Sequence, residues 1–379
     1  MAIIFLQLGK FLMRIIYFML KLFPTTKKVV FLSRQYNEPS IDFIMLEAEI
    51  LRRDPTVKIV MICERIEATA VVGNKRETPL LVVGFRLFYN TLRSMYHVAT
   101  SRVAVLDTYS PIISLLNHKP TLTVIQIWHA MGKIKQSGYR NLDTEGGGRS
   151  SRVAKAMNMH QGYDIIVAGA AAWNQFYCES FNVEEDVLYN VGLPRIDYIL
   201  QNRDSLRERI LKKHDGLGAK PVVIYAPTWR KTGIDGWDSF IDQFDFDQFN
   251  LIVKSHPNQE LAMPTSKIYT IADFSTLECL AIADYLVTDY SATAVEAAAL
   301  DVKTYYYLYD YEVYVKKNGL NIDLFTEMAG CVFEDASDLI KALEAEYPVD
   351  SFEGYKAKFL PETIGQSTDL ITDKIMERL

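Results

Sequence analysis

Short apolar runs alternate with longer segments of helical periodicity along most of the chain. After Pro24, runs rich in β-branched residues occupy positions 28–33, 57–63, 103–109, 123–129 and 163–169, and a second series occupies 221–229, 250–257, 284–291 and 303–309. Runs that are apolar at nearly every position predict parallel strands buried on both faces. Two such series, each interleaved with helices, predict an α/β protein with two Rossmann-like, doubly wound sheets.

A polar segment at about 197–220 separates the two series. It contains SLRERILKKHDGLGAK, which is typical of an exposed helix followed by a glycine-rich turn. We therefore expect a first domain over residues 25–197 and a second over 198–379, and the last helix is a candidate to pack back on the first domain.

Residues 1–24 combine an apolar composition with three cations. At about 100° per residue, Lys10, Arg14 and Lys21 fall within a narrow arc of a helix, and large apolar residues cover most of the rest. This pattern predicts an amphipathic helix that lies in a membrane interface with its cations toward anionic headgroups. A helix packed on the protein's own core and a true membrane span are the alternatives that the sequence leaves open.

Composition and charge narrow the class of protein. The chain has 379 residues, of which 49% are apolar and 23% charged, enough for two globular domains. A net charge of -6 argues against a nucleic-acid partner. Four widely spaced cysteines predict free thiols in a cytoplasmic protein and neither a disulfide framework nor a zinc site.

Ligands of open parallel sheets bind beyond the carboxyl ends of the strands, so the residues at those ends are the candidates for chemistry. In the first series, IQIWHAMGKIKQSGY carries His129 at a strand end, where a neutral imidazole can take a proton from a hydroxyl near pH 7. Lys133 and Lys135 follow and are candidates to contact a diphosphate or an anionic lipid headgroup. The alternative is a structural histidine beside Trp128.

In the second series, two neighbouring strand ends carry donors that suit a phosphate. YAPTWR ends with Thr228 and Arg230, and KSHPNQ carries Lys254 and His256. The arginine fork, the ammonium and the imidazole can all donate to phosphoryl oxygens.

A third strand end, TDYSATAVE, enters a helix whose first turn offers free backbone N–H groups to an anion. Thr288, Asp289 and Ser291 lie in this turn. Glu296 has two interpretations that the sequence cannot separate: a carboxylate on ribose hydroxyls, or the partner of Thr293 in a capping box.

Five motifs in the same order resemble the CDP-glycerol glycerophosphotransferase family, which includes the teichoic acid primases and polymerases. They are WHAMGKIKQSGY, VGLPRID, YAPTWR, KSHPN, and ADYLVTDYSA…E followed by YYLYDYEVY, and together they span about residues 121–323. The resemblance implies a GT-B-like fold with the active site between the domains. It also implies transfer of glycerol or ribitol phosphate from a CDP-polyol, with no metal or other cofactor, at the cytoplasmic face of the bacterial membrane.

By motif position, His129 resembles the catalytic histidine of the first domain and His256 that of the second. The positions that resemble the family's donor-binding residues are Arg230, Thr288, Asp289, Ser291 and Glu296. The chain departs from the His-Gly-Thr-Pro form of many polymerases, since it has Ala130, Met131 and Gly132 after the histidine. Its length resembles that of a primase, which adds one unit.

The expected reaction moves a polyol phosphate from a CDP-polyol to a glycan carried on undecaprenyl diphosphate, as in wall teichoic acid synthesis, and releases CMP. The expected partners are these two substrates and the membrane surface, to which the protein would attach peripherally. Two other functions stay open: a GT-B glycosyltransferase with a nucleotide-sugar donor, and a non-catalytic membrane-associated scaffold. The choice of glycerol or ribitol, the number of additions and the oligomeric state, a homo-oligomer included, stay open too.

Overall fold

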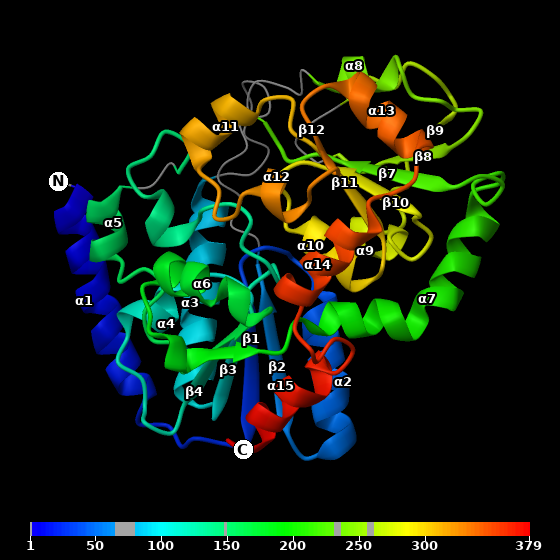
Figure 1. Ribbon diagram of the computed structural model, residues 1–379. Coiled ribbons are helices and arrows are strands. Elements are labelled where there is room, and N and C mark those ends of the chain that lie inside the picture. The colour runs from blue at the N-terminus through cyan, green and yellow to red at the C-terminus, as the bar shows by residue number, and fades with distance from the viewer. Residues whose placement is uncertain (1, 65–79, 148–149, 231–235, 256–260) are drawn as a thin grey trace.

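Two six-stranded parallel sheets form the lower and upper halves of the molecule (Figure 1). The computed structural model describes residues 2–64, 80–147, 150–230, 236–255 and 261–379. The strand order is β2-β1-β3-β4-β5-β6 in the first sheet and β12-β11-β10-β7-β8-β9 in the second. Counted from β7, the second order is the doubly wound 3-2-1-4-5-6 arrangement. The prediction of two doubly wound α/β sheets is confirmed.

The strands of the first sheet coincide with the apolar runs. They are β1 (Lys28–Ser33), β2 (Lys58–Cys63), β3 (Val103–Leu106), β4 (Thr123–Gln126), β5 (Ile165–Ala168) and β6 (Leu188–Asn190). Every residue of β1 and β3 is buried, as expected for strands covered on both faces. The sequence did not predict β6, because its three residues are only half-buried and include an asparagine.

The second sheet repeats this relation between sequence and structure. Its strands are β7 (Val222–Ala226), β8 (Asn250–Val253), β9 (Ile268–Tyr269), β10 (Tyr285–Thr288), β11 (Lys303–Tyr307) and β12 (Val332–Phe333). The two-residue strands β9 and β12 are too short to leave a periodic signal. The other strands stop two to four residues before their predicted ends.

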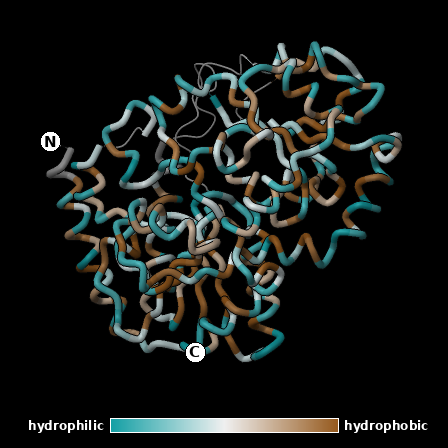
Figure 2. Tube along the Cα trace, in the orientation of Figure 1, coloured by the Kyte–Doolittle hydropathy of each residue, from teal (hydrophilic) through white to brown (hydrophobic). Residues whose placement is uncertain are grey.

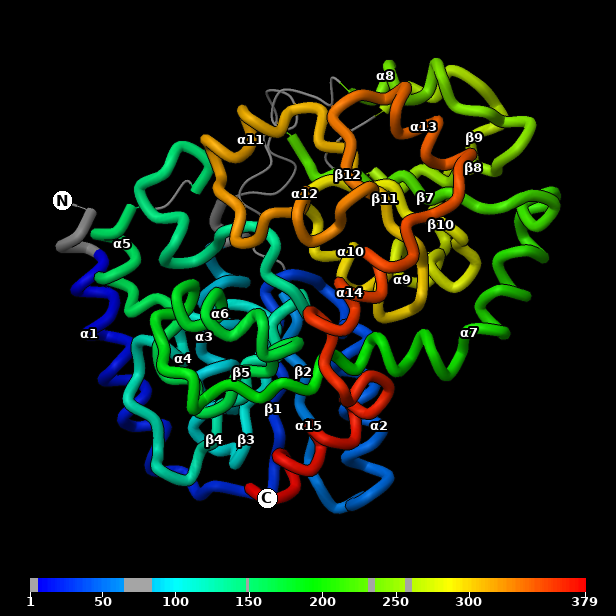
Figure 3. Tube along the Cα trace, in the orientation of Figure 1, coloured from blue at the N-terminus to red at the C-terminus, as the bar shows by residue number. Residues whose placement is uncertain are grey.

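Helices cover both sheets and connect them. In chain order they are α1 (Ala2–Leu20), α2 (Ile41–Arg53), α3 (Leu80–Ala99), α4 (Pro111–Leu115), α5 (Ser151–Ala156), α6 (Asn174–Phe181), α7 (Pro194–Lys213), α8 (Gly236–Ile241), α9 (Thr276–Cys279), α10 (Thr293–Ala299), α11 (Tyr311–Asn318), α12 (Leu324–Glu327), α13 (Ala336–Glu344), α14 (Val349–Phe359) and α15 (Ser367–Met376). The described residues also contain three short 3₁₀ helices: η1 (Gly138–Asn141), η2 (Ala171–Trp173) and η3 (Glu185–Val187). The chain passes between the sheets through α7 and returns after α14, so that α15 lies beside α2 (Figure 3).

Helix α1 lies on the outer side of the lower half of the molecule, where it contacts α3 (Figure 1). Lys10 is buried, and its Nζ donates to the Ala156 carbonyl at 2.6 Å. Arg14 donates from Nε to the Leu115 carbonyl at 3.3 Å. Tyr17, on the same arc, is fully buried. The burial of Lys10 against a backbone carbonyl of the first domain does not support the prediction that this residue faces lipid headgroups. Arg14 is exposed, and its contact with headgroups stays a prediction. Lys21 is half-buried at the end of this arc.

The opposite side of α1 exposes large apolar side chains, and hydrophobic segments recur along this helix in Figure 2. We call this surface the apolar face. It consists of Leu8, Phe11, Leu12, Ile15, Phe18, Met19, Leu22 and Phe23, together with Phe85, Leu87, Phe88 and Tyr89 of the adjacent helix α3. No helix in the described ranges is long and apolar enough to span a bilayer. The two faces of the predicted amphipathic helix exist, but the apolar one points outward.

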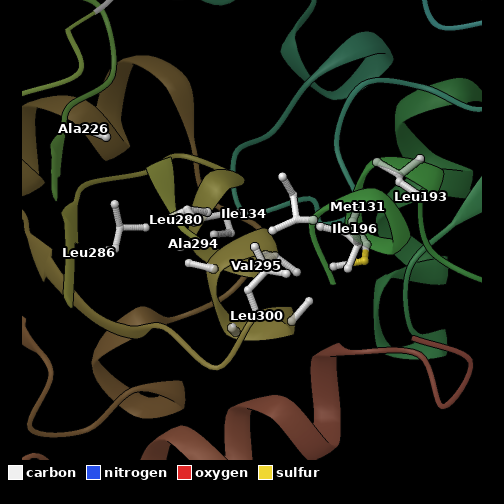
Figure 4. Close-up of a cluster of buried hydrophobic side chains, with 14 of the residues drawn as sticks. Met131, Ile134, Leu193, Ile196, Ala226, Leu280, Leu286, Ala294, Val295 and Leu300 are labelled. Atoms are coloured by element: carbon white, nitrogen blue, oxygen red, sulfur yellow. The ribbon is translucent and has the colours of Figure 1, made fainter. Parts of the chain in front are cut away.

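The two halves of the molecule contact each other through the loop after β4 and helix α10. Figure 4 shows Met131 and Ile134 from the first sheet's side near Val295 of α10. A Cβ at Gly132 would come within 2.5 Å of the Val295 side chain, so only glycine allows the loop after β4 to approach α10 this closely. Asn321 fixes the same loop from the second domain, with its Nδ2 2.6 Å from the Lys133 carbonyl.

Candidate active site

A cavity of about 900 Å³ lies between the two sheets, where their strand ends face each other. Its first wall comes from the segments that follow β1 and β4, and its second wall from the starts of α9 and α10 together with Tyr314 and Asn318 of α11. We call it the central cavity. Its position agrees with the rule that parallel α/β sheets bind ligands beyond the carboxyl ends of their strands.

His129 lies in the first wall, three residues beyond the end of β4. The preceding Trp128 adopts a left-handed backbone (φ 58°), and its ring lies 4.1 Å, centroid to centroid, from the imidazole. The Nδ1 atom of His129 lies 3.0 Å from Gln35 Nε2 and 3.3 Å from the Asp107 carbonyl. Within the described structure, the ring's polar contacts therefore use Nδ1, and Nε2 is the nitrogen available to a substrate.

The environment of His129 favours its neutral form. Burial lowers the pKa of the imidazole to about 3, and the nearby charge of Lys133 acts in the same direction. A neutral imidazole can accept a proton, which is what a general base requires.

Asp107 and Gln35 were not predicted as site residues. Asp107 follows β3 directly and is 1% exposed, and burial raises the pKa of its carboxyl to about 6. Its Oδ2 has no hydrogen-bond partner among the described residues. Gln35 stands two positions beyond the run predicted at 28–33, and Asp107 lies near the end of the run predicted at 103–109. The rule that ligands bind beyond strand ends, which identified His129, could therefore also have identified them.

Lys133 lies in the same wall, but aromatic rings surround its ammonium. Its Nζ is 4.2 Å from the ring centroid of Phe181, 4.6 Å from that of Trp128 and 4.9 Å from that of Tyr177. The Ser137 hydroxyl lies at 3.2 Å. Burial lowers the pKa of Lys133 to about 7. These contacts are those of a cation held by cation–π attraction and do not support the prediction that Lys133 meets a phosphate.

Lys135 is the cation of the first wall that faces the second domain. It is half-exposed, lines the central cavity, and its main chain pairs with Leu320. Burial lowers its pKa; the charge of Asp289 opposes this effect and that of Arg230 adds to it. The influence of these two residues places Lys135 opposite the predicted donor-binding segment.

Arg230 is held by two carboxylates of its own domain. Its Nε is 2.8 Å from Asp310 Oδ2 and its Nη2 is 3.1 Å from Asp289 Oδ2, while the ring of Tyr314 lies 4.6 Å away. Burial opposes the charge, but Asp310 and Asp289 outweigh it and raise the pKa of the guanidinium. Arg230 is not among the residues that line the central cavity.

Thr228, Thr288, Asp289 and Lys254 also make contacts within the second domain. Asp289 accepts from the backbone N and the hydroxyl of Thr228, and it is 1% exposed. Thr288 donates to the Ala226 carbonyl, and Lys254 donates to the carbonyls of Ile271 and Phe274. In this structure the four side chains therefore support the wall and do not line it.

Ser291 and Glu296 do line the central cavity. Ser291 Oγ accepts from the Thr293 backbone N at 3.2 Å. The N-cap of α10 is Ala292, so Glu296 and Thr293 do not form the capping box that the sequence allowed. Instead, Glu296 Oε1 lies 3.5 Å from Arg195 Nη1. Burial raises the pKa of Glu296 to about 7, and Arg195 opposes this shift.

Arg195 joins the two walls and was also missed. It begins α7, pairs with Asp42 of α2, and lies next to Glu296 of α10. It belongs to the motif VGLPRID, whose sequence alone predicts no role for the arginine. His256, the second predicted catalytic histidine, lies outside the described residues, and its role stays a prediction.

The family comparison covers almost the whole chain. The model of the CDP-Glycerol:Poly(glycerophosphate) glycerophosphotransferase family matches residues 15–377. A teichoic acid ribitol-phosphate primase of Bacillus spizizenii is 27% identical over 92% of this chain and 90% of its own length. A teichoic acid poly(ribitol-phosphate) polymerase of the same organism is 25% identical over 74% of this chain, and the match spans 47% of that longer protein.

Solved structures show the same fold. The wall teichoic acid polymerase TagF superposes with a TM-score of 0.75 at 16% identity, covering 99% of this chain and 97% of that one. A UDP-GlcNAc 2-epimerase from Neisseria meningitidis superposes with a TM-score of 0.56 at 13% identity, over 92% of this chain and all of that one. The fold is thus GT-B-like, and the chain belongs to the CDP-glycerol glycerophosphotransferase family of teichoic acid enzymes.

Proposed function

We propose that this protein transfers a polyol phosphate from a CDP-polyol to a glycan on undecaprenyl diphosphate, and that it works as a primase. The observation that carries the proposal is the central cavity, which places a neutral imidazole opposite a helix start with two hydroxyls. The full-length similarity to a ribitol-phosphate primase supports a single addition, and one TagF structure was obtained after a soak with CDPG.

The donor binds against the second wall in this proposal. Ser291, Thr293 and the backbone at the start of α10 donate to the diphosphate, and Lys135 approaches it from the first wall. Glu296 accepts hydrogen bonds from hydroxyls of the ribose or the polyol. Arg230 and Asp289 act from behind the wall, because they fix the turn that contains Ser291.

The acceptor hydroxyl approaches from the first wall. Its oxygen attacks the phosphorus that carries the polyol, the bond from that phosphorus to the bridging oxygen breaks, and CMP leaves with the electron pair. His129 Nε2 takes the hydroxyl proton. The negative charge of the bound donor opposes the influence of Lys133 and Lys135, so it raises the pKa of His129 from the low value of the free site. Positioning and charge stabilisation supply most of the rate in phosphoryl transfer.

Purified protein incubated with CDP-glycerol or CDP-ribitol and an undecaprenyl-diphosphate-linked disaccharide tests the proposal. We expect CMP release that depends on the acceptor, and one polyol phosphate per acceptor by mass spectrometry. UDP- or GDP-sugars serve as the comparison. If they stabilise the protein against thermal unfolding and CDP-polyols do not, the chain is a sugar transferase; if no nucleotide does, it is a scaffold.

We also propose that the apolar face inserts into the cytoplasmic leaflet of the membrane. An exposed stripe of this size is unfavourable in water, whereas the headgroup–acyl boundary accommodates it. Because Lys10 is buried against the first domain, the attachment depends on apolar burial more than on charge.

Sedimentation with phosphatidylglycerol-containing vesicles measures this attachment. We expect the double variant Phe11→Ser, Phe18→Ser to bind at least ten-fold more weakly, and Phe325→Ser, an exposed position of the second domain, to bind as the parent does. Binding of the parent should change little between low and high salt. A steep loss with salt would show that headgroup charge dominates and that the proposed orientation is wrong.

A further inference from the structure

Two groups of the first domain meet the same nitrogen of the proposed base. Gln35 Nε2 lies 3.0 Å from His129 Nδ1, and the main-chain carbonyl of Asp107 lies 3.3 Å from the same atom. An amide nitrogen can only donate a hydrogen bond, and a carbonyl can only accept one. A neutral imidazole has one proton, so Nδ1 satisfies only one of these neighbours at a time. The two contacts therefore belong to two different tautomers of His129.

Only one of these tautomers can act as a base toward a substrate in the central cavity. With the proton on Nδ1, this atom donates to the Asp107 carbonyl, and Nε2 keeps a lone pair that can take a hydroxyl proton. With the proton on Nε2, Nδ1 accepts from the Gln35 amide, and Nε2 already holds the proton that it would have to receive. The orientation of Gln35 in this structure, which gives the shorter of the two distances, favours the second tautomer.

The position of the imidazole depends on groups other than the Gln35 amide. The ring of Trp128 lies 4.1 Å from it, centroid to centroid, and Arg195 Nη1 lies 3.5 Å from the main-chain carbonyl of His129. Gln35 is itself held through its backbone N, which donates to the hydroxyl of Ser33, a residue that is 3% exposed. The terminal bond of a glutamine has a broad, two-fold torsional preference, so the amide can turn while the ring stays in place.

A half-turn of the amide brings Gln35 Oε1, in place of Nε2, next to the imidazole. The oxygen accepts from Nδ1–H and stabilises the tautomer whose Nε2 is free. It also stabilises the imidazolium that forms when Nε2 takes a proton, because hydrogen bonding to a charged form favours that form. The charges of Lys133, Arg195 and Lys135 all disfavour this imidazolium, whereas the Asp107 carbonyl favours it. An oxygen of Gln35 would therefore add to the single acceptor that supports the protonated base.

We infer that Gln35 is a positioning residue that selects the tautomer of His129, and that its amide must present Oε1 to the ring for the base to act. This inference rests on the proposed function, because it specifies how that function's base is prepared. The bonds that form and break stay the same: Nε2 takes the acceptor's proton, the acceptor oxygen bonds to phosphorus, and CMP leaves with the electron pair.

Two substitutions of similar length fix the tautomer in opposite directions. Gln35→Glu offers only oxygens and holds the proton on Nδ1, whereas Gln35→Lys offers only donors and holds the proton on Nε2. We expect Gln35→Lys to lower acceptor-dependent CMP release by about 10²–10⁴-fold, the usual contribution of a general base, and Gln35→Glu to keep a rate close to the parent's. Attraction of the anionic substrates by charge alone predicts the opposite order.

NMR spectroscopy of full-length protein labelled with ¹⁵N-histidine measures the tautomer without catalysis. The signals of His129 are those that disappear in His129→Ala. We expect the proton on Nδ1 in Gln35→Glu and on Nε2 in Gln35→Lys. Gln35→Glu should also move the acid limb of the pH–rate profile to higher pH, since a carboxylate next to Nδ1 raises the pKa of the imidazole.

Three further variants separate the hydrogen bond from charge and from folding. Gln35→Met carries no charge and leaves only the Asp107 carbonyl, so the proton should lie on Nδ1. The matched controls are Gln201→Glu and Gln201→Lys, at an exposed position of α7, and they should change neither the rate nor the His129 signals. Stabilisation by CDP-glycerol should persist in every variant of Gln35, because the donor binds to the other wall.

The inference is overturned if Gln35→Glu and Gln35→Lys show the same tautomer. It is also overturned if both lose the same activity with no shift of the pH–rate profile, since Gln35 would then have only a structural role. The NMR measurement needs no turnover, so it separates the two proposals. Opposite tautomers in a protein that releases no CMP from any CDP-polyol would reject the proposed function alone. CMP release that falls in His129→Ala but not in Gln35→Lys would reject this inference alone.

Discussion

The buried cations at the two walls of the central cavity have pKa values that are shifted in opposite directions. In the first wall, Lys133 is enclosed by aromatic rings, and burial lowers its pKa to about 7. Behind the second wall, Arg230 is less buried than Lys133, and Asp310 and Asp289 raise its pKa. The cation of the first wall can therefore lose its charge near neutral pH, whereas the arginine behind the second wall keeps its charge.

This difference fits a division of work between the walls. A base must be neutral before it accepts a proton, and the pKa of His129 is lowered to about 3 in the first wall. A turn that contacts a diphosphate must keep its shape as charge moves, and an arginine between two carboxylates provides that rigidity. The substitutions that follow test this difference between the two walls.

The substitution His129→Ala has the largest expected effect. It removes the proposed base and should lower acceptor-dependent CMP release by about 10²–10⁴-fold, the usual contribution of general base catalysis. Thermal stabilisation by CDP-glycerol should remain, because the donor binds to the other wall. His214→Gln, at the end of α7, is the control. An unchanged rate in His129→Ala would refute the assignment of the base.

The substitution Arg230→Met tests the second wall through stability. It leaves the buried carboxylate of Asp289 without its partner, which typically costs about 3–5 kcal/mol. Chemical denaturation measures the loss, and Arg207→Met on the exposed side of α7 is the matched control. Addition of Asp310→Asn to Arg230→Met should cost less than the sum of the two single changes, since both disrupt one network. Strict additivity would mean that the network does not act as a unit.

Much of this contrast could not be predicted from the sequence. The rule that ligands bind beyond the carboxyl ends of parallel strands predicted His129, Ser291 and Glu296 as site residues, and all three line the central cavity. It succeeded there because apolar strand runs are easy to locate in a sequence. It could not separate Lys133 from Lys135, which stand two residues apart in a loop without periodicity. The rings of Tyr177 and Phe181 that enclose Lys133 lie on α6, far along the chain.

The same limit applies to the orientation of helix α1. The cationic arc and the apolar arc were both predicted, because helical periodicity is a local property of the sequence. Which arc faces the protein depends on the carbonyls of Leu115 and Ala156, which accept from Arg14 and Lys10. Those acceptors lie on distant segments, so the pattern of residues 1–24 cannot predict them.

The substitution Lys133→Met should act in the opposite direction from Arg230→Met. A thioether replaces a buried cation among aromatic rings, so stability near pH 7 should rise by about 1–3 kcal/mol. The pKa of Lys133 is about 7 in the folded protein and 10.5 is its ordinary value. Between these values the unfolded chain binds the extra proton, so the parent gains stability as the pH rises.

The advantage of the Lys133→Met variant should therefore be full at pH 7 and shrink toward pH 10.5. Unfolding titrations at a series of pH values measure this change. A loss of stability at pH 7 would show that the cation–π contacts outweigh the burial cost and would remove the contrast between the walls.

The substitution Glu296→Gln has the smallest expected effect on stability and tests whether this carboxylate serves the fold or the donor. The pKa of Glu296 is raised to about 7 from an ordinary 4.5, so between these values the folded protein binds the extra proton and the parent loses stability as the pH rises. The glutamine variant should not show this decline, whereas Glu312→Gln on the exposed side of α11 should keep it. If Glu296 also accepts a ribose or polyol hydroxyl, the same change should weaken CDP-glycerol binding by about ten-fold, the cost of one hydrogen bond to a charged group. A flattened stability profile with unchanged donor affinity would assign Glu296 to the contact with Arg195 alone, and the second wall would then recognise its donor through Ser291, Thr293 and the backbone of α10.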